Sequence, residues 1–250
     1  MLAIFHKDLA HPPEELRSPS TQAAAHHPDE ILRKFIARRP GESVSLSFGG
    51  KAILASDRGA SPIKNPKLFC GYDEIYCLFE GRLNNLCALN KQYGLTKCAN
   101  EAMLVIEAYR TLRDRGPYPA DQVVKDLDGS FGFVVYDSVC GSVFTALGAD
   151  GAVKLYWGVG DGHVVISDQL EIVEEACGKS FAPFPPGFIF HSEGGLMSFE
   201  HPMHKVKAVA RVDSDGSLCG SNFRVDVYTR INSIPRRGSA ANWTEWDPRD

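Results

Sequence analysis

The stretch 127–168 constrains the fold of this chain more than any other part of it. It contains four short runs of aromatic and β-branched residues, and turn residues such as Asp150-Gly151 separate them. The runs are Phe131–Tyr136, Ser142–Leu147, Val153–Trp157 and His163–Ser167. Runs of this composition at a spacing of roughly 8–12 residues are typical of consecutive antiparallel strands. The stretch therefore predicts a four-stranded antiparallel meander with its own hydrophobic face.

Strands and helices are expected on both sides of this meander. Alternating or continuous apolar runs predict strands at 1–5, 44–48, 52–55, 75–79, 188–190, 196–199 and 223–228. Helical periodicity and capping residues predict helices at 29–38, 84–93, 101–115, 120–127 and 169–176. We expect Glu80-Gly81 to turn the chain out of its strand, Asn84 to cap the second helix and Asn100 the third. The cations at 113 and 115 are interpreted as a solvated helix end.

Composition and charge restrict the class of protein. A chain of 250 residues fits one large domain or two small ones, and we predict a single domain over 1–229 with a flexible tail over 230–250. The net charge of −4 gives no reason to expect a nucleic acid or an anionic membrane as a partner. No apolar run is long enough to insert into a membrane, and no secretory signal is visible. We predict a cytoplasmic protein, with a nuclear location as an open alternative.

The cysteine and histidine positions argue against disulfide and metal sites. Seven cysteines are dispersed without a C-x-x-C pair, which favours free thiols in a reducing compartment. His201 and His204 come closest to metal-ligand spacing, but Pro202 between them favours a turn. We predict no metal site and no cofactor.

Three segments in order resemble the class II glutamine amidotransferase domain found at the front of asparagine synthetases. They are Met1–Phe5, Leu78–Asn85 and the run Leu127-Asp128-Gly129-Ser130-Phe131-Gly132-Phe133. The resemblance covers roughly residues 1–200. It implies the N-terminal-nucleophile fold, an α+β, four-layer αββα sandwich of two antiparallel sheets flanked by helices.

Two further motifs are similar to signatures of the plant aluminium-induced, stem-specific protein family. Tyr93-Gly94-Leu95 matches its YGL motif, and Leu112-Arg113-Asp114-Arg115 matches its LRDR motif. This resemblance extends over nearly the whole chain. Members of that family are known chiefly as stress-, hormone- and starvation-responsive transcripts, so the resemblance implies a stress-responsive plant protein.

The nucleophile of the amidotransferase family is absent. That family uses a processed N-terminal cysteine, whose thiol attacks the glutamine amide and whose free α-amine acts as the base. The matching position here is Leu2, which has no nucleophilic atom, and a bulky second residue should prevent removal of Met1.

Other groups of that site also differ. The resemblance aligns Glu80 with the asparagine that stabilises the oxyanion, and losing one such donor typically costs about 2.7–4 kcal/mol of transition-state stabilisation. Gly81 is retained as the second donor. Ala99 stands for the aspartate that binds the substrate ammonium, and Lys51 is the nearest counterpart of the arginine that binds its carboxylate.

We therefore predict a catalytically inactive, amidotransferase-like protein that acts as a binding or regulatory module. The alternative is an enzyme of altered chemistry that uses the remnant pocket for a small amide or an amino acid. The pocket candidates are Leu2, Lys51, Glu80, Gly81, Arg82, Asn85 and Ala99. The partners considered are a second copy in a homodimer and an unidentified protein. Ser239, after Arg236-Arg237, is a candidate phosphorylation site.

Overall fold

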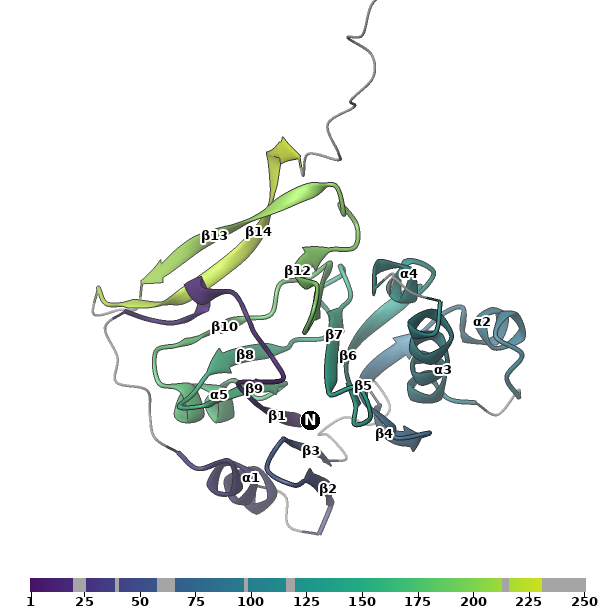
Figure 1. The fold of residues 1–250 in the computed structure, drawn as a ribbon, viewed down its shortest axis with the longest axis horizontal. Helices are drawn as coiled ribbons and strands as arrows, with labels where there is room; N and C mark the ends of the chain where they lie inside the picture. Colours follow the sequence, from purple (N-terminus) through teal and green to yellow (C-terminus); the bar gives the residue numbers. More distant parts are fainter. Residues whose placement is uncertain are drawn as a thin grey trace, which may run out of the picture.

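The computed structural model describes residues 1–19, 26–38, 41–57, 66–96, 99–115, 120–212 and 216–230. Two six-stranded antiparallel sheets pack face to face, and helices cover both outer faces (Figure 1). A two-stranded hairpin lies across one end of the sandwich. The α+β, four-layer αββα architecture expected from the sequence is confirmed.

The first sheet contains the start of the chain. Its strands in spatial order are β10 (Phe181–Pro183), β8 (Tyr156–Val159), β9 (His163–Ser167), β1 (Leu2–His6), β3 (Ala52–Asp57) and β2 (Ser43–Phe48). Helices α1 (Pro28–Ala37) and α5 (Leu170–Cys177) cover its outer face, and a short 3₁₀ turn, η1, spans Glu14–Leu16. Because β1 is central, both of its faces are buried, which explains why its sequence is continuously apolar.

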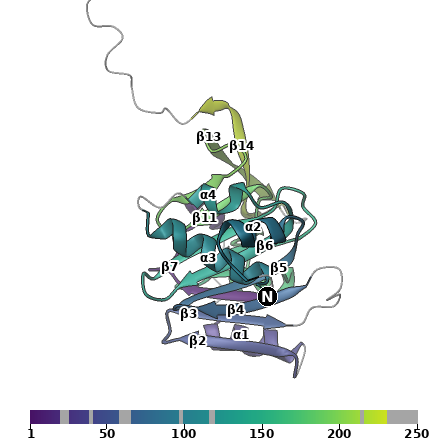
Figure 2. The same cartoon turned by 90° about the vertical axis from the view of Figure 1, so that its right-hand side faces the viewer.

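The second sheet packs on the first. Its order is β12 (Gly195–Ser198), β11 (Phe188–His191), β7 (Ser142–Leu147), β6 (Gly129–Asp137), β5 (Ile75–Leu83) and β4 (Lys67–Tyr72). Helices α2 (Leu86–Gln92), α3 (Glu101–Arg113) and α4 (Ala120–Lys125) lie on its outer side, as Figure 2 shows from that side. Asn100 caps α3 as expected, because its side-chain oxygen accepts a hydrogen bond from the Met103 N–H at 2.9 Å.

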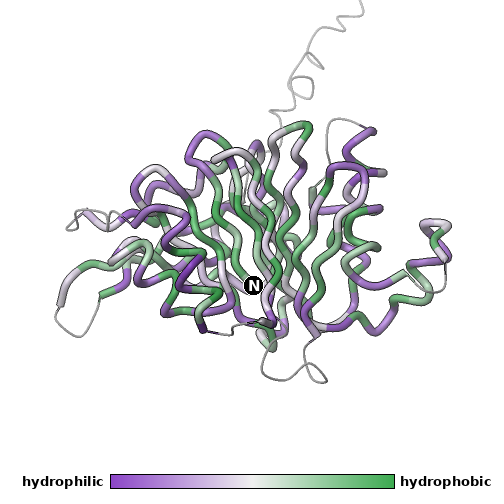
Figure 3. The backbone as a smooth tube through the Cα atoms, turned by 90° about the horizontal axis from the view of Figure 1, so that it is seen from below, coloured by the Kyte–Doolittle hydropathy of each residue, from purple (hydrophilic) through white to green (hydrophobic). Residues whose placement is uncertain are grey.

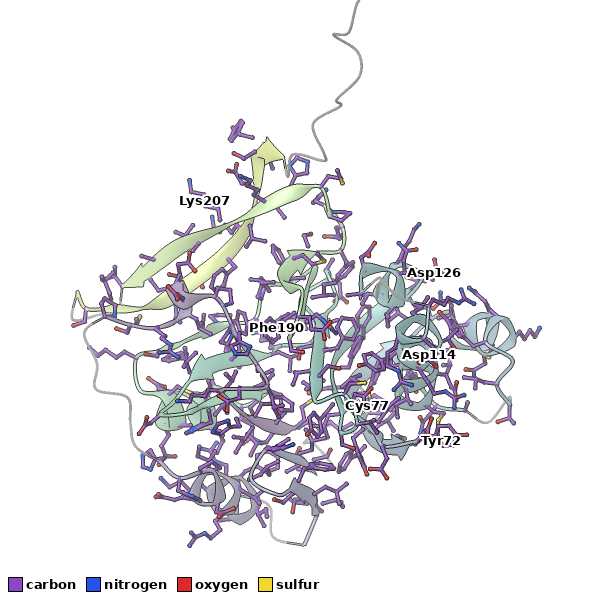
Figure 4. All side chains as sticks on the ribbon, in the orientation of Figure 1. Tyr72, Cys77, Asp114, Asp126, Phe190 and Lys207 are labelled. Carbon is purple, nitrogen blue, oxygen red and sulfur yellow. The ribbon has the colours of Figure 1, made fainter. Side chains whose placement is uncertain are left out.

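Three apolar layers hold this sandwich together. One lies between the sheets and includes Met1, Phe5, Trp157 and Phe190. The other two lie between each sheet and its helices. Figure 3 shows the hydrophobic strands gathered in the centre, and Figure 4 shows Phe190 between the two sheets. Strand alternation sends the side chains of Met1 and Phe5 into the layer between the sheets and that of Leu2 toward α1 and α5.

The predicted meander is wrong as a single sheet. Its strands β6 and β7 pair with each other in the second sheet, whereas β8 and β9 pair in the first. The chain crosses between sheets in the segment 148–155, which is longer than the tight turns on either side of it. The predicted strand at 153–157 forms only from Tyr156 onward, although Val153 and Leu155 are still buried between the sheets.

Several local predictions near the site also need correction. Strand β5 continues through Glu80-Gly81 and ends at Leu83, because β6 pairs along its whole length. Helix α2 begins at Leu86 with Asn85 at the N-cap and no side-chain capping bond, so Asn84 is not its cap.

Two strands were not predicted. They are β4 and β13 (His204–Val212), and β13 pairs with β14 (Leu218–Arg230). The tail over 231–250, including Ser239, lies outside the described residues.

Candidate functional site

The start of β1 lies between the ends of two neighbouring strands, β3 and β9. Leu2 is paired with Ala55 on β3 and with Ser167 on β9. Both neighbours continue into a Ser-Asp pair, so Asp57 and Asp168 come to lie on either side of the Met1 α-amino group. The amino group donates a hydrogen bond to Asp168 Oδ1, and its nitrogen is 3.6 Å from Asp57 Oδ1.

Lys67 joins this group from the other sheet. It is the first residue of β4, and its Nζ donates to Asp57 Oδ1 at 2.6 Å and to Asp168 Oδ2. The Lys67 side chain is only 6% exposed and that of Asp57 only 2% exposed. Two buried cations therefore face two carboxylates, and we call Met1, Asp57, Lys67, Asp168 and the neighbouring Glu80 the ionic cluster.

Glu80 is the fifth member of the ionic cluster. It is paired with Lys67 in the register of β4 and β5. Its Oε2 is buried and has no hydrogen-bond partner among the described residues. Burial and the Asp168 carboxylate raise the pKa of Glu80 to about 7, although Lys67 and the Met1 amine oppose that shift. Near neutral pH, this carboxyl is therefore close to half protonated.

The two amines of the cluster are perturbed in opposite directions. Burial lowers the pKa of the Met1 amino group, even though the neighbouring carboxylates favour its charged form. Burial also disfavours the charge of Lys67, but Asp168 and Asp57 outweigh it and raise the Lys67 pKa. The five groups of the ionic cluster are amines and carboxylates. This arrangement can hold charge and exchange a proton at Glu80, but it contains no thiol or hydroxyl nucleophile.

Of the seven predicted pocket residues, Glu80 belongs to the ionic cluster, and Leu2 and Gly81 are chain neighbours of its members. Leu2 is fully buried, but its side chain packs in the layer beneath α1 and α5. The backbone N–H of Gly81 donates a hydrogen bond to the Pro66 carbonyl at 3.0 Å. This donor is therefore already occupied within the protein. Gly81 has φ +119°, and a Cβ there would overlap the Ser130 carbonyl oxygen, which explains the need for glycine.

The other four predicted pocket residues are placed differently. Lys51 is exposed in the β2–β3 turn, where its carbonyl accepts the His6 N–H at the opposite end of β1. Arg82 is exposed on β5. Asn85 ties two loops together, donating to the Asp126 carbonyl and accepting from the Asp128 N–H. The Ala99 carbonyl accepts from Asn90 Nδ2 at 3.0 Å.

Asp57, Lys67 and Asp168 were missed from the sequence. Two of them carried a signal, since Ala55-Ser56-Asp57 and Ile166-Ser167-Asp168 both place Ser-Asp at the end of a buried apolar run. That repetition becomes meaningful only once β1 is known to lie between the two strands. Lys67 carried no local signal, because a lysine at a strand end is ordinarily solvated.

Two hollows lined by described residues lie away from the ionic cluster. One, of about 660 Å³, lies between the segment 7–19 and the β8–β9 turn. A second, of about 390 Å³, includes Lys51 and His163. In the described part of the chain, no group of three or more His, Cys, Asp or Glu side chains is arranged to hold a metal ion. Within the same ranges, no helix is long and apolar enough to span a membrane.

Comparisons of the sequence find two kinds of relative. A family model described as "Aluminium induced protein" matches residues 2–225. The stem-specific protein TSJT1 of Nicotiana tabacum is 37% identical over 149 residues, which are 58% of this chain and 99% of that protein. A probable glutamine-hydrolyzing asparagine synthetase of Dictyostelium discoideum is 32% identical over 149 residues, 57% of this chain. The matched region is 24% of the synthetase, so this chain spans about a quarter of its length.

Solved structures include similar chains at lower identity. A glutamine phosphoribosylpyrophosphate amidotransferase from B. subtilis, complexed with ADP and GMP, aligns with a TM-score of 0.44 and 16% identity. The alignment covers 60% of this chain and 35% of the amidotransferase chain.

Proposed function

The chain belongs to the aluminium-induced protein family, and from this premise we propose that it is a catalytically inactive, amidotransferase-like protein. It acts as a binding or regulatory module in the plant stress response, in the cytoplasm or nucleus. The relatives that hydrolyse glutamine, by their names, align with 57% and 44% of this chain.

The hydrogen bond from Gly81 to Pro66 is the observation that carries the proposal. In the resemblance, this N–H is the one oxyanion donor that the sequence retains, and here a backbone carbonyl accepts its hydrogen bond. An oxyanion donor must be free to point at the developing charge. By the resemblance, Glu80 stands where the other donor would be, and in its ionised form this side chain repels developing negative charge instead of stabilising it. The segment Pro66-Lys67 therefore fills the place where a substrate carbonyl would bind.

The state of the Met1 amine supports the same conclusion. A catalytic α-amine acts as a base from its neutral form, beside a thiol. Here the amine is held between two carboxylates, and the Leu2 side chain beside it lies in another layer of the fold. Burial lowers the pKa of this amine and so favours its neutral form, but the Leu2 side chain beside it has no nucleophilic atom for the amine to activate.

The test is a glutaminase assay on the purified full-length protein. Glutamate release from glutamine, and aspartate release from asparagine, are measured by coupled dehydrogenase and transaminase assays, with a plant asparagine synthetase as the positive control. We expect no release above the rate without protein. Release that follows the protein through successive purification steps and scales with its concentration contradicts the proposal.

The alternative function, small-amide or amino-acid binding with altered chemistry, is favoured by one observation. Glu80 Oε2 is buried without a hydrogen-bond partner among the described residues, and such atoms in native proteins call for a water or a ligand. A thermal-shift screen with glutamine, glutamate and asparagine tests it, since a ligand at about 100 times its Kd adds about 2.7 kcal/mol of stability. The alternative predicts a shift that disappears in Glu80→Gln. A flat response in both proteins leaves the binding-module proposal as the better account.

A further inference from the structure

Among the described residues, no element covers the outer edge of β2, the last strand of the first sheet. The other edge of that sheet, β10, is covered by β14, and Arg211 donates to the Phe181 carbonyl there at 2.8 Å. In the second sheet, β12 contacts β13, and β4 lies against α3 and β3. Among the described elements, only β3 shares an extensive contact with β2. Figures 1 and 2 both show β2 as the outermost strand on the side away from the hairpin.

The composition of β2 is unusual for an exposed edge. The strand reads Ser-Val-Ser-Leu-Ser-Phe, without a charge or a proline, and its pairing with β3 is continuous, without a bulge. Charges, prolines and bulges are the features by which soluble proteins prevent sheet edges from pairing. Val44 is 61% exposed and Leu46 42% exposed. This edge is therefore open to a further strand and carries apolar side chains that such a strand would cover.

The sequence of β2 is complementary to itself in an antiparallel arrangement. Residues directly opposite each other in an antiparallel pair have their side chains on the same face. A two-fold axis through Leu46 places Leu46 opposite its own copy, Val44 opposite Phe48 and Ser45 opposite Ser47. Apolar side chains thus meet apolar ones on the face that continues the layer between the sheets, and serines meet serines on the other face. No charge is buried.

From this self-complementarity we propose that two copies of the chain associate through β2, in an antiparallel pairing centred on Leu46. The pairing joins the two first sheets into one continuous sheet of twelve strands, from the six that each copy contributes. Interfaces built on a two-fold axis use the same surface patch on both copies, which a palindromic strand satisfies. The inference does not depend on the loss of catalysis, so a monomeric protein would leave the proposed function standing.

Oligomeric state gives the first test. Sedimentation velocity and light scattering over a concentration series should show a dimer for the wild type. Leu46→Lys brings two like charges together on the two-fold axis and should weaken dimerisation at least about tenfold. The matched control is Val139→Lys, because Val139 is 73% exposed in the β6–β7 turn and far from β2 in the chain. Circular dichroism and thermal melts establish that both variants fold.

Cross-linking gives a second, position-specific test. Leu46→Cys places two thiols opposite each other at the axis and should form an intermolecular disulfide under mild oxidation. Val44→Cys faces Phe48 of the other copy and should cross-link much less. The wild type under the same oxidant measures the background from its own cysteines. A monomeric wild type, a dimer that survives Leu46→Lys, an equal loss in Val139→Lys, or equal cross-linking at 44 and 46 would each overturn the inference.

Discussion

Lys67 is the residue on which the start of the chain most depends. It is a member of the second sheet, yet its partners belong to the first, since Asp57 ends β3 and Asp168 directly follows β9. Those same carboxylates hold the Met1 amine. Lys67 therefore links the two sheets at one end by charge, in addition to the apolar layer between them.

The first residue-scale prediction concerns the loss of this cation. Lys67→Met leaves two carboxylates facing a single amine in a buried place, and breaking such a pair typically costs about 3–5 kcal/mol. Chemical denaturation should show a loss of unfolding free energy in that range. The control is Lys34→Met, because Lys34 pairs with Glu175 at the surface and is 33% exposed, and such pairs contribute about 1 kcal/mol or less. Equal losses in the two variants would contradict the structural role given to Lys67.

The second residue-scale prediction is a pH dependence at Glu80. Its pKa rises from 4.5 in the unfolded chain to about 7 in the folded protein. Over this interval the folded state keeps a proton that the unfolded chain releases, so the stability contributed by Glu80 is full below pH 4.5 and declines as the pH rises to about 7. Glu80→Gln cannot ionise. Its stability relative to the wild type should therefore increase by about 2 kcal/mol between those pH values.

Denaturant melts at a series of pH values test this. Glu14→Gln, at an exposed carboxylate in η1, is the control and should show no such trend. A stability difference between Glu80→Gln and wild type that is constant from pH 4.5 to 7 would argue against a buried, titrating carboxyl.

At the scale of elements, the end of α3 is anchored to a strand. The Arg113 guanidinium donates to Asp137 Oδ2 at 2.8 Å, and Asp137 is fully buried at the end of β6. The other Asp137 oxygen accepts the N–H groups of Val139 and Cys140 in the following turn. The interpretation of this helix end as merely solvated is therefore wrong for Arg113, and the LRDR motif has a structural role in docking the helix.

Replacing Arg113 tests that docking. Arg113→Met leaves Asp137 buried without its cation and should cost about 3 kcal/mol of unfolding free energy. Arg110→Met on the same helix is the control, since Arg110 is 33% exposed and pairs with the exposed Asp73 and the partly buried Glu107. Similar stabilities for the two variants would show that the Asp137 contact adds nothing to the fold.

The sequence predicted elements well where one pattern dominated. Helices with an apolar stripe and clear end signals, such as α1 and α3, lie within about two residues of their predicted bounds. Strands β4 and β13 were missed because their apolar runs are short or interrupted. In β4 only three apolar residues stand between Lys67 and Gly71, and in β13 the exposed lysines at 205 and 207 alternate with half-buried residues. The predicted meander included the β6–β7 and β8–β9 pairs, but not their placement in different sheets, because that placement depends on contacts distant in the chain.

At the scale of the whole molecule, part of the candidate site could be predicted from the sequence and part could not. The resemblance drew attention to Glu80, and the structure brings this residue close to the Met1 amine. The sequence could not reveal that the Pro66 carbonyl accepts the Gly81 N–H or that Asp57 and Asp168 converge on the Met1 amine. These residues come together only when both sheets are assembled.

This arrangement predicts that restoring the missing residues is not enough to restore activity. In the double variant Leu2→Cys, Glu80→Asn, the Pro66 carbonyl still accepts the Gly81 N–H, and Lys67 still occupies Asp57 and Asp168. We expect no glutamate release from glutamine in the coupled assay, even after mass spectrometry shows that Met1 has been removed. Turnover by this variant would mean that the segment 66–67 moves aside readily.

The burial of the Met1 amine also bears on how the protein is studied in cells. A fluorescent or affinity tag fused before Met1 turns that amine into an amide, which has no charge to offer Asp168. It also introduces extra chain at the junction of the two sheets. Localisation and pull-down experiments with such fusions would then report on a protein that lacks the ion pair between Met1 and Asp168. A tag attached to the C-terminal end of the chain leaves the Met1 amine free to form that pair.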